Sequence, residues 1–114
     1  MGLSEDAIDP TRFLEDVEMR VGEVVDVAAF PEARKDVYKL TVDFGEERLQ
    51  SAAGLTDLYD HDDLLGAQVI AVVNLGTVTI AGFDSECLVT GVDGPDGVVH
   101  LTTERDVEPG TRVY

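Results

Sequence analysis

The stretch VEMRVGEVVDVAAF, residues 17–30, decides the fold. Its apolar residues recur at every second position and share one predicted face: Val17, Met19, Val21, Val25 and Val27. This period of two predicts a β-strand with one side against a core. Glu23, next to Gly22, interrupts the pattern. Because small closed barrels bend a long strand at a glycine or a bulge, the sequence predicts a long, bent first strand.

The segments downstream supply the remaining strands. YKLTVDF, residues 38–44, alternates between apolar and polar, and RLQSA, residues 48–52, completes a meander after the turn GEE. QVIAVVNL, residues 68–75, is almost continuously apolar, which is typical of a strand buried on both faces. SECLVTGV, residues 85–92, predicts one further strand. Short strands are also predicted near the end of the chain, in VVHLT and EPGTRVY.

Two short helices are predicted outside the strands. Residues 9–16 form the first, with Asp9 as N-cap and a proline at the first helical position. We expect Phe13 and Leu14 of this helix to pack against the body of the protein. A single helical turn, capped by Asp60, follows the third strand.

These elements indicate an all-β protein with a five-stranded OB-fold barrel, a short N-terminal helix and a C-terminal strand extension. Pattern alone leaves a small β-sandwich as the alternative. A chain of 114 residues closes one hydrophobic core, so we expect a single domain over 1–114. Within it, residues 1–8 are expected to be flexible, 9–16 helical, and 17–114 to form the barrel and its extension.

The chain has no long apolar stretch and no signal-peptide pattern, which predicts a cytoplasmic protein. Its one cysteine, Cys87, lies in an apolar run and is predicted to be a buried thiol.

The charge balance is one-sided. Twenty-four acidic residues face eight basic ones, for a formal net charge of -16. Such a charge ordinarily opposes a nucleic-acid partner, because a phosphate backbone is repelled. The acidic residues are spread over the whole chain, which predicts a halophilic protein with a solvated acidic surface. In about 1 M salt the Debye length is only about 3 Å, so that surface repels little beyond contact range. A mesophilic, merely soluble acidic protein is the alternative.

Positive charge nevertheless gathers in one place. Arg34 and Lys35, in the stretch FPEARK, are the only adjacent basic pair, and Lys39 follows four residues later. This stretch connects the first two predicted strands, and in OB barrels that loop is among those that contact oligonucleotides. Arginine offers a planar fork to phosphate and lysine a compact charge. Pairing with carboxylates of the same loop is the alternative.

The motifs RVGEV, FPEARK, YKLTVDFG, VIAVVNL and AGFDSE occur in this order over residues 10–114. In order and spacing the chain resembles the stand-alone tRNA-binding domain family, and within it the CsaA-type secretion-chaperone-like proteins. The resemblance implies an OB barrel that forms a homodimer through its N- and C-terminal segments. It also implies binding of tRNA or other structured RNA without a catalytic step and without a cofactor.

By the resemblance, polar positions of later strands join the basic loop on one RNA-binding surface. The predicted site consists of Arg34, Lys35, Lys39, Ser51, Asn74, Ser85 and Glu86. For Asn74, which ends an apolar strand, tying down the following loop is the alternative. Phe30, Tyr38 and Phe83 are candidate surfaces for base stacking.

The chain also departs from the family. CsaA-type members often carry a Pro-Pro-Arg-Arg type segment after the position of Asn74, where this chain has LGTVT. The missing arginines remove part of the expected positive surface.

A second function is implied by the CsaA-type resemblance: a chaperone that binds unfolded or pre-export peptides in an apolar groove at the dimer. An acidic protein suits basic peptides, so this alternative stays open.

Other candidate sites are weak. DLYDHDD, residues 57–63, lacks the spacing of a calcium loop and is predicted to be a helix-capping loop. Two histidines and one cysteine argue against a zinc site, so no metal is predicted. No nucleophile lies in a defined motif with a histidine and a carboxylate, so we predict no enzyme.

Overall fold

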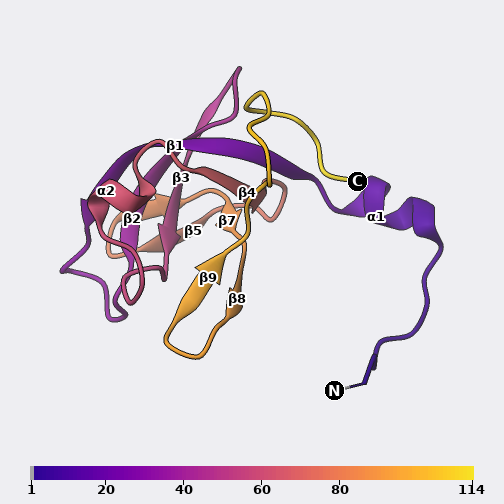
Figure 1. Ribbon diagram of the computed structural model, residues 1–114, viewed down its shortest axis with the longest axis horizontal. Helices are drawn as coiled ribbons and strands as arrows, with labels where there is room; N and C mark the ends of the chain where they lie inside the picture. The colour runs from indigo at the N-terminus through magenta and orange to yellow at the C-terminus, as the bar shows by residue number, and fades with distance from the viewer. Residues whose placement is uncertain (1) are drawn as a thin grey trace.

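The computed structural model describes residues 2–114 and shows a five-stranded antiparallel sheet in the order β3-β2-β1-β4-β7 (Figure 1). These strands are β1 (Met19–Ala29), β2 (Tyr38–Asp43), β3 (Arg48–Ala53), β4 (Gln68–Val72) and β7 (Leu88–Val89). The sheet curls until β3 approaches β7, which makes a nearly closed barrel. The predicted OB-like barrel is therefore confirmed.

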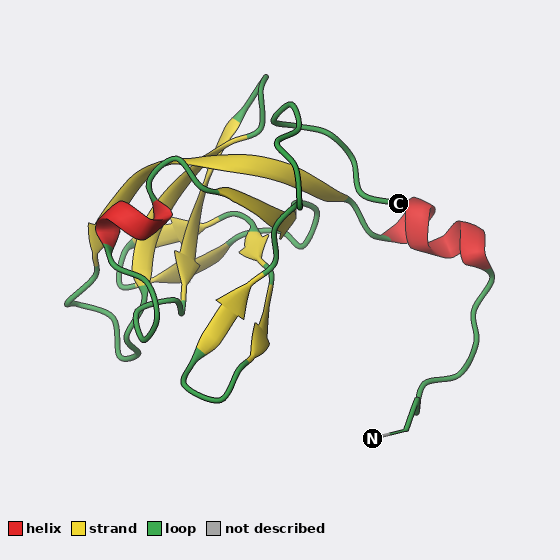
Figure 2. Cartoon of the chain, in the orientation of Figure 1, coloured by secondary structure: helices red, strands yellow, loops and turns green. Residues whose placement is uncertain are grey.

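Two hairpins and two helices complete the fold (Figure 2). The hairpins pair β5 (Val78–Ile80) with β6 (Phe83–Ser85), and β8 (Gly91–Asp93) with β9 (Val98–His100). The helices are α1 (Pro10–Asp16) and α2 (His61–Leu64). None of the helices within residues 2–114 is long and apolar enough to span a membrane.

Strand β1 is bent by a bulge, as predicted, but the bulge changes which residues reach the core. The register against β2 shifts just after Val24, so Val25 has no direct partner there. Val24 and Val27 are buried, whereas Val25 is only half-buried. The prediction that Val25 lies on the core face is wrong, because the inward face before the bulge is that of Gly22 and Val24. The extra residue then reverses the alternation, which brings Val27 into the core. Before the bulge Gly22 faces inward, where a Cβ atom would lie 2.4 Å from Cγ1 of Val42.

The core lies inside the curled sheet, on the inner face of β1, β2, β3 and β4, and α2 contributes Leu64 to it. Its buried residues are Val24, Val27, Leu40, Val42, Ala53, Leu55, Leu64 and Val69. Helix α2 begins with a capping box, in which the Asp60 carboxylate accepts the Asp63 N–H at 2.9 Å and the reverse bond is also 2.9 Å. The capping loop predicted for residues 57–63 is thus confirmed, and it brings Leu64 into the core.

The predicted strand over residues 85–92 is wrong, because this segment is divided among three short strands. Each one has a different partner: β6 pairs with β5, β7 with β4, and β8 with β9. A single straight strand cannot change partners twice within eight residues, so the chain turns between the pieces.

Helix α1 forms with the predicted cap but does not pack on the barrel. The Asp9 carboxylate accepts the Thr11 N–H at 3.0 Å. No residue of α1 is buried, and Phe13 and Leu14 are 36% and 45% exposed. The helix points away from the barrel in Figure 1, so the expectation that it packs against the body is wrong for the single chain.

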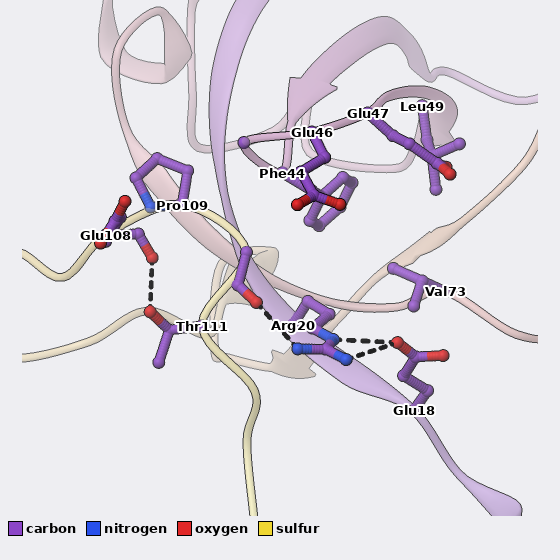
Figure 3. A pocket seen from close by; sticks show the side chains of 12 residues that line it. Glu18, Arg20, Phe44, Glu46, Glu47, Leu49, Val73, Glu108, Pro109 and Thr111 are labelled. Carbon is purple, nitrogen blue, oxygen red and sulfur yellow. Dashed lines mark hydrogen bonds and ion pairs between the residues drawn. The ribbon is translucent and has the colours of Figure 1, made fainter.

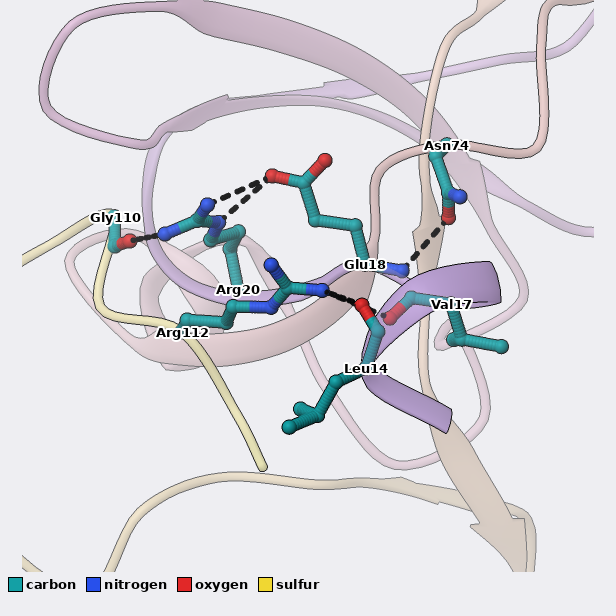
Figure 4. Close-up of polar contacts among 7 residues, drawn as sticks. All are labelled: Leu14, Val17, Glu18, Arg20, Asn74, Gly110 and Arg112. Carbon is teal, nitrogen blue, oxygen red and sulfur yellow. Dashed lines mark hydrogen bonds and ion pairs between the residues drawn. The ribbon is translucent and has the colours of Figure 1, made fainter. Parts of the chain in front are cut away.

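Polar contacts nevertheless fix the start of β1 to the helix (Figure 4). The Asn74 amide oxygen accepts the Glu18 N–H at 2.9 Å, and its nitrogen donates to the Asp16 carbonyl at 3.0 Å. The Arg112 guanidinium donates to the Leu14 carbonyl. These contacts set the direction of α1, although none of its residues is buried.

The C-terminal segment runs alongside the first half of β1. Gly110 N–H donates to the Val21 carbonyl at 2.7 Å, and Val113 N–H donates to the Met19 carbonyl at 2.9 Å. The Arg20 side chain donates to the Gly110 carbonyl at 3.0 Å. The predicted C-terminal strand extension is confirmed as this backbone pairing. Flexibility of residues 2–8 stays a prediction, and Met1 lies outside the described residues.

Replacing Gly22 with Val should destabilise the barrel, because the new side chain would collide with Val42 and with Phe44, whose Cε1 lies 2.8 Å from the position that a Cβ atom would take. Overpacking of this kind typically costs about 1–3 kcal/mol. Chemical denaturation measures the free energy of unfolding. Gly54→Val is the matched control, because nothing lies within 4 Å of its Cβ position. Equal midpoints for the two variants would show that Gly22 does not face a packed interior.

Candidate nucleic-acid interface

Lys39 lies where two loops of the barrel meet. It is on β2, opposite Ala28 near the end of β1. Its Nζ atom is 5.1 Å from the ring centroid of Phe30 and 6.0 Å from that of Phe83. The two rings contact edge to face with centroids 5.5 Å apart. Because cation–π contacts hold an ammonium over a ring, the aromatic pair orients the Lys39 charge.

The aromatic residues are less available for stacking than the sequence suggested. Phe30 is only 6% exposed, so its predicted role as a free stacking surface is wrong. Its ring is a wall of the Lys39 site instead. The Tyr38 hydroxyl donates to the Tyr59 carbonyl at 2.8 Å, and the Tyr38 ring packs against the core. Phe83 is half-buried and forms the other wall.

Arg34 and Lys35 lie on the exposed loop between β1 and β2. Within residues 2–114, neither side chain is within 4.0 Å of a carboxylate oxygen. The structure therefore does not show the alternative, in which Arg34 or Lys35 pairs with a carboxylate of the same loop. Together with Lys39 they place three positive charges at one end of β1.

Ser51 is near this end but faces the barrel interior. It is 1% exposed, and its hydroxyl donates to the Cys87 carbonyl at 2.9 Å. Cys87 itself is buried, as predicted, and burial raises the pKa of its thiol to about 11.

Ser85 and Glu86 join β3 at the point where the barrel closes. The Ala52 N–H donates to the Ser85 hydroxyl at 3.1 Å, and the Gln50 N–H donates to the Glu86 carboxylate at 2.9 Å. Both are half-buried. The structure thus brings Ser51, Ser85 and Glu86 into the same end of the barrel as Lys39, with their polar atoms already bonded. RNA contact by these residues stays a prediction.

Asn74 is separate from the other predicted site residues. It lies beside Glu18, next to the start of β1, whereas Lys39 is opposite Ala28 near its end. The ten residues from Glu18 to Ala28 correspond to roughly 30 Å of chain along the strand. The Asn74 amide binds the junction of α1 and β1, not its own loop, which differs from the alternative considered for it.

The segment that replaces the family's basic motif is an exposed loop leading into β5. Leu75 and Val78 are each 61% exposed. The hairpin that follows turns through Ala81 and Gly82, both with positive φ. This hairpin carries Phe83 towards Lys39.

A groove that sequence reasoning missed lies at the opposite end of β1 (Figure 3). Its volume is about 760 Å³, and its charged lining residues are Glu18, Arg20, Glu46, Glu47 and Glu108. Phe44, Leu49, Val73 and Pro109 supply apolar side chains. Arg20 is held by Glu18, with Nη2 2.9 Å from the carboxylate, so the other three glutamates leave the groove acidic. The sequence shows these glutamates in two turns, and only folding brings the turns together.

Metal binding gains no support from the geometry. Across the described part of the chain, no three His, Cys, Asp or Glu side chains are grouped as metal ligands.

Residues 19–112 match the family described as "Putative tRNA binding domain". The chain belongs to this tRNA-binding domain family. A similar relative is the methionine–tRNA ligase of Methanocaldococcus jannaschii, 35% identical over 102 residues, which cover 89% of this chain and 16% of the ligase. The methionine–tRNA ligase of Halobacterium salinarum is 39% identical over 111 residues, which cover 97% of this chain and 16% of that protein. The chain thus spans about one-sixth of the length of these relatives.

The fold of this tRNA-binding domain is also similar to solved structures. The CsaA chaperone of Picrophilus torridus superposes with a TM-score of 0.86 at 37% identity, covering 94% of this chain and 100% of that one. The family resemblance inferred from the sequence motifs is therefore confirmed.

Proposed function

We propose that this protein binds tRNA, or an RNA of similar structure, as a homodimeric OB-barrel module with no catalytic step. The observation that supports it is that Arg34 and Lys35 are exposed on the loop that follows β1, and that Lys39 lies on β2 opposite Ala28 at the same end of β1, in a chain with a formal net charge of -16. In OB barrels, the loop after the first strand and the loop before the last one flank the oligonucleotide. Here those loops are represented by FPEARK and the β5–β6 hairpin, which meet around Lys39.

The three cations are assigned to RNA phosphates. Arg34 and Lys35 are exposed and free of carboxylate partners within residues 2–114, so they need not break an ion pair to bind. Lys39 is already oriented by two aromatic rings. The other predicted site residues, Ser51, Asn74, Ser85 and Glu86, are assigned to the framework that supports this surface, because their polar atoms bind the protein itself.

Salt is expected to weaken the phosphate contacts strongly. With three contacts and a slope of about -0.7 to -0.9 per contact, a tenfold rise in salt lowers the affinity roughly 100- to 500-fold. We propose that the protein is cytoplasmic and halophilic, and that shape and hydrogen bonding then supply most of the affinity. The dispersed acidic surface supports this setting.

The double variant Arg34→Glu, Lys35→Glu should bind bulk tRNA at least about tenfold more weakly than the unaltered protein. The slope of log affinity against log salt should also become shallower by about 1.4 to 1.8, because two phosphate contacts are lost. Fluorescence anisotropy from 0.2 to 2 M KCl measures both quantities.

The control for this experiment is the double variant Arg48→Glu, Arg105→Glu. It changes the net charge by the same amount at exposed positions outside the basic loop. Equal weakening by both pairs would mean that overall charge, and not the loop, governs binding. Unchanged binding by the loop variant would refute the assignment of Arg34 and Lys35.

The homodimer is supported by the exposed apolar face of α1. Phe13 and Leu14 are exposed, yet Arg112 and Asn74 hold the end of the helix in place. A fixed apolar face without cover is typical of a protein interface. A second copy of this chain would cover it.

Light scattering in 2 M KCl should therefore give about twice the chain mass of 12.3 kDa. The variant Phe13→Glu, Leu14→Glu should give the monomer mass without unfolding, because neither residue is buried in the single chain. Circular dichroism checks that the fold is kept, and Thr11→Glu on the same helix is a control for added charge. A monomer mass for the unaltered protein would exclude the dimer.

A second function, a chaperone for unfolded or pre-export peptides, is supported by the groove at the far end of β1. Three glutamates without a basic partner within residues 2–114 line it beside Phe44 and Pro109, a combination that suits basic segments with apolar residues. The similarity of the whole chain to the CsaA chaperone of Picrophilus torridus also supports this second function.

Reduced and alkylated lysozyme, an unfolded basic protein, is the probe for this alternative. If the groove binds peptides, Glu46→Lys, Glu47→Lys should weaken binding of the probe about tenfold and leave tRNA binding no weaker. The basic-loop variant should behave in the opposite way. Failure of the unaltered protein to bind the probe in pull-down and anisotropy assays would exclude this function.

A further inference from the structure

The barrel closes where β3 meets the segment 85–87, and we call this junction the seam. It is held partly by side chains. Every residue of β3 has a cross-strand partner on β2, but in an antiparallel pair only alternate residues direct their backbone N–H and C=O groups towards that partner. The N–H groups of Gln50 and Ala52 point to the other edge of β3. One backbone hydrogen bond crosses that edge, from the Glu86 N–H to the Gln50 carbonyl at 2.8 Å. The two N–H groups are instead bound by the Glu86 carboxylate and the Ser85 hydroxyl, at 2.9 and 3.1 Å.

Side chains perform this task although β6 contacts β3, because among the described residues only the Glu86 N–H forms a backbone hydrogen bond to β3 across this edge. Residues of β6, which ends at Ser85, pair with β5 in the hairpin, for example Val78 opposite Ser85. A strand edge without partners exposes N–H groups that other chains can bind. Ser85 and Glu86 therefore serve as substitutes for a neighbouring strand.

The seam lies directly beside the cationic site. Ala52, whose N–H donates to Ser85, is the cross-strand partner of Lys39. Phe83 lies two residues before Ser85 on the same short strand, about 7 Å away. Because Phe83 contacts both Phe30 and Lys39, a shift of Ser85 would move one wall of the Lys39 site.

We propose that Ser85 and Glu86 act as a latch that positions the β5–β6 hairpin, and through Phe83 the Lys39 ammonium, for contact with RNA phosphate. They are positioning residues and do not touch the ligand. The proposal rests on the RNA-binding function above. Glu86 fits this role better than direct contact, since a carboxylate repels phosphate but accepts strongly from an amide.

The latch also explains why a serine and a glutamate are adjacent at the seam. A serine hydroxyl reaches Ala52 and a longer glutamate reaches Gln50, so two adjacent side chains cover two alternate amides of β3. Ser51 adds a bond on the inner side, to the Cys87 carbonyl. The seam is thus closed from both faces.

The first measurement is amide hydrogen exchange by NMR. Ser85→Ala should speed exchange of the Ala52 amide about two- to tenfold, the effect of losing one neutral hydrogen bond, and Ser85→Thr should restore it. Glu86→Ala should speed exchange of the Gln50 amide about tenfold or more, because a hydrogen bond to a charged carboxylate is stronger than a neutral one. Glu86→Gln, which keeps an acceptor oxygen, is the rescuing variant. Thermal unfolding identifies any variant that has lost its fold, and the Thr and Gln variants keep the test valid in that case.

The second measurement is tRNA affinity in a double-mutant cycle. Ser85→Ala should weaken binding about threefold or more in the unaltered protein and have no further effect in a Lys39→Met background, because it acts through Lys39. The salt slope should be unchanged by Glu86→Gln. Additive effects of Ser85→Ala and Lys39→Met, or failure of Glu86→Gln to keep affinity, would overturn the latch and indicate direct RNA contact.

The two proposals fail in distinguishable ways. If the unaltered protein binds no tRNA, the RNA-binding function is wrong, and the latch loses its role in binding even if exchange at Ala52 and Gln50 responds. If tRNA binds through Lys39 but neither amide responds to the variants, the latch alone is wrong.

Discussion

Strand β1 is the element on which the rest of the structure depends, because it pairs along its first half with β4 and along its second half with β2. The change of partner occurs at Glu23, which is opposite both Gln68 and Asp43. The bulge just after Val24 bends the strand there, and Gly22 leaves room for Val42 inside the bend. Without a bend, a strand of this length would form a flat sheet, and β3 could not approach β7.

The two ends of this strand have different chemistry. At the end near Ala29, the basic loop and the β5–β6 hairpin surround Lys39. At the start, near Met19, the C-terminal segment and the β2–β3 turn enclose an acidic groove. Because exposed charges farther apart than a Debye length are largely screened at physiological salt, the charge at one end has little effect on the potential at the other. This separation is why loop and groove variants distinguish the proposed functions.

The candidate site follows from sequence only in part. Arg34, Lys35 and Lys39 were predictable, because three cations within six positions of so acidic a chain form a local pattern. The orientation of Lys39 was not, because it depends on Phe83, which is 44 residues away in the sequence and reaches Lys39 through the hairpin. Ser51, Ser85 and Glu86 were recognised as polar positions of interest, but their bonds to Cys87, Ala52 and Gln50 cross the seam of the barrel.

Local sequence determined the elements whose causes are local: the alternation of β2 and β3, the cap of α1 by Asp9, and the capping box of α2. Local sequence could not determine the position of Val25, because a bulge is defined by the register against another strand. It also could not determine the division of residues 85–92, because each piece pairs with a different strand. Nor could it place α1, whose direction depends on Asn74 and Arg112 far along the chain. Periodicity and capping act within a few residues, whereas register, closure and the meeting of distant side chains are settled only when strands pair.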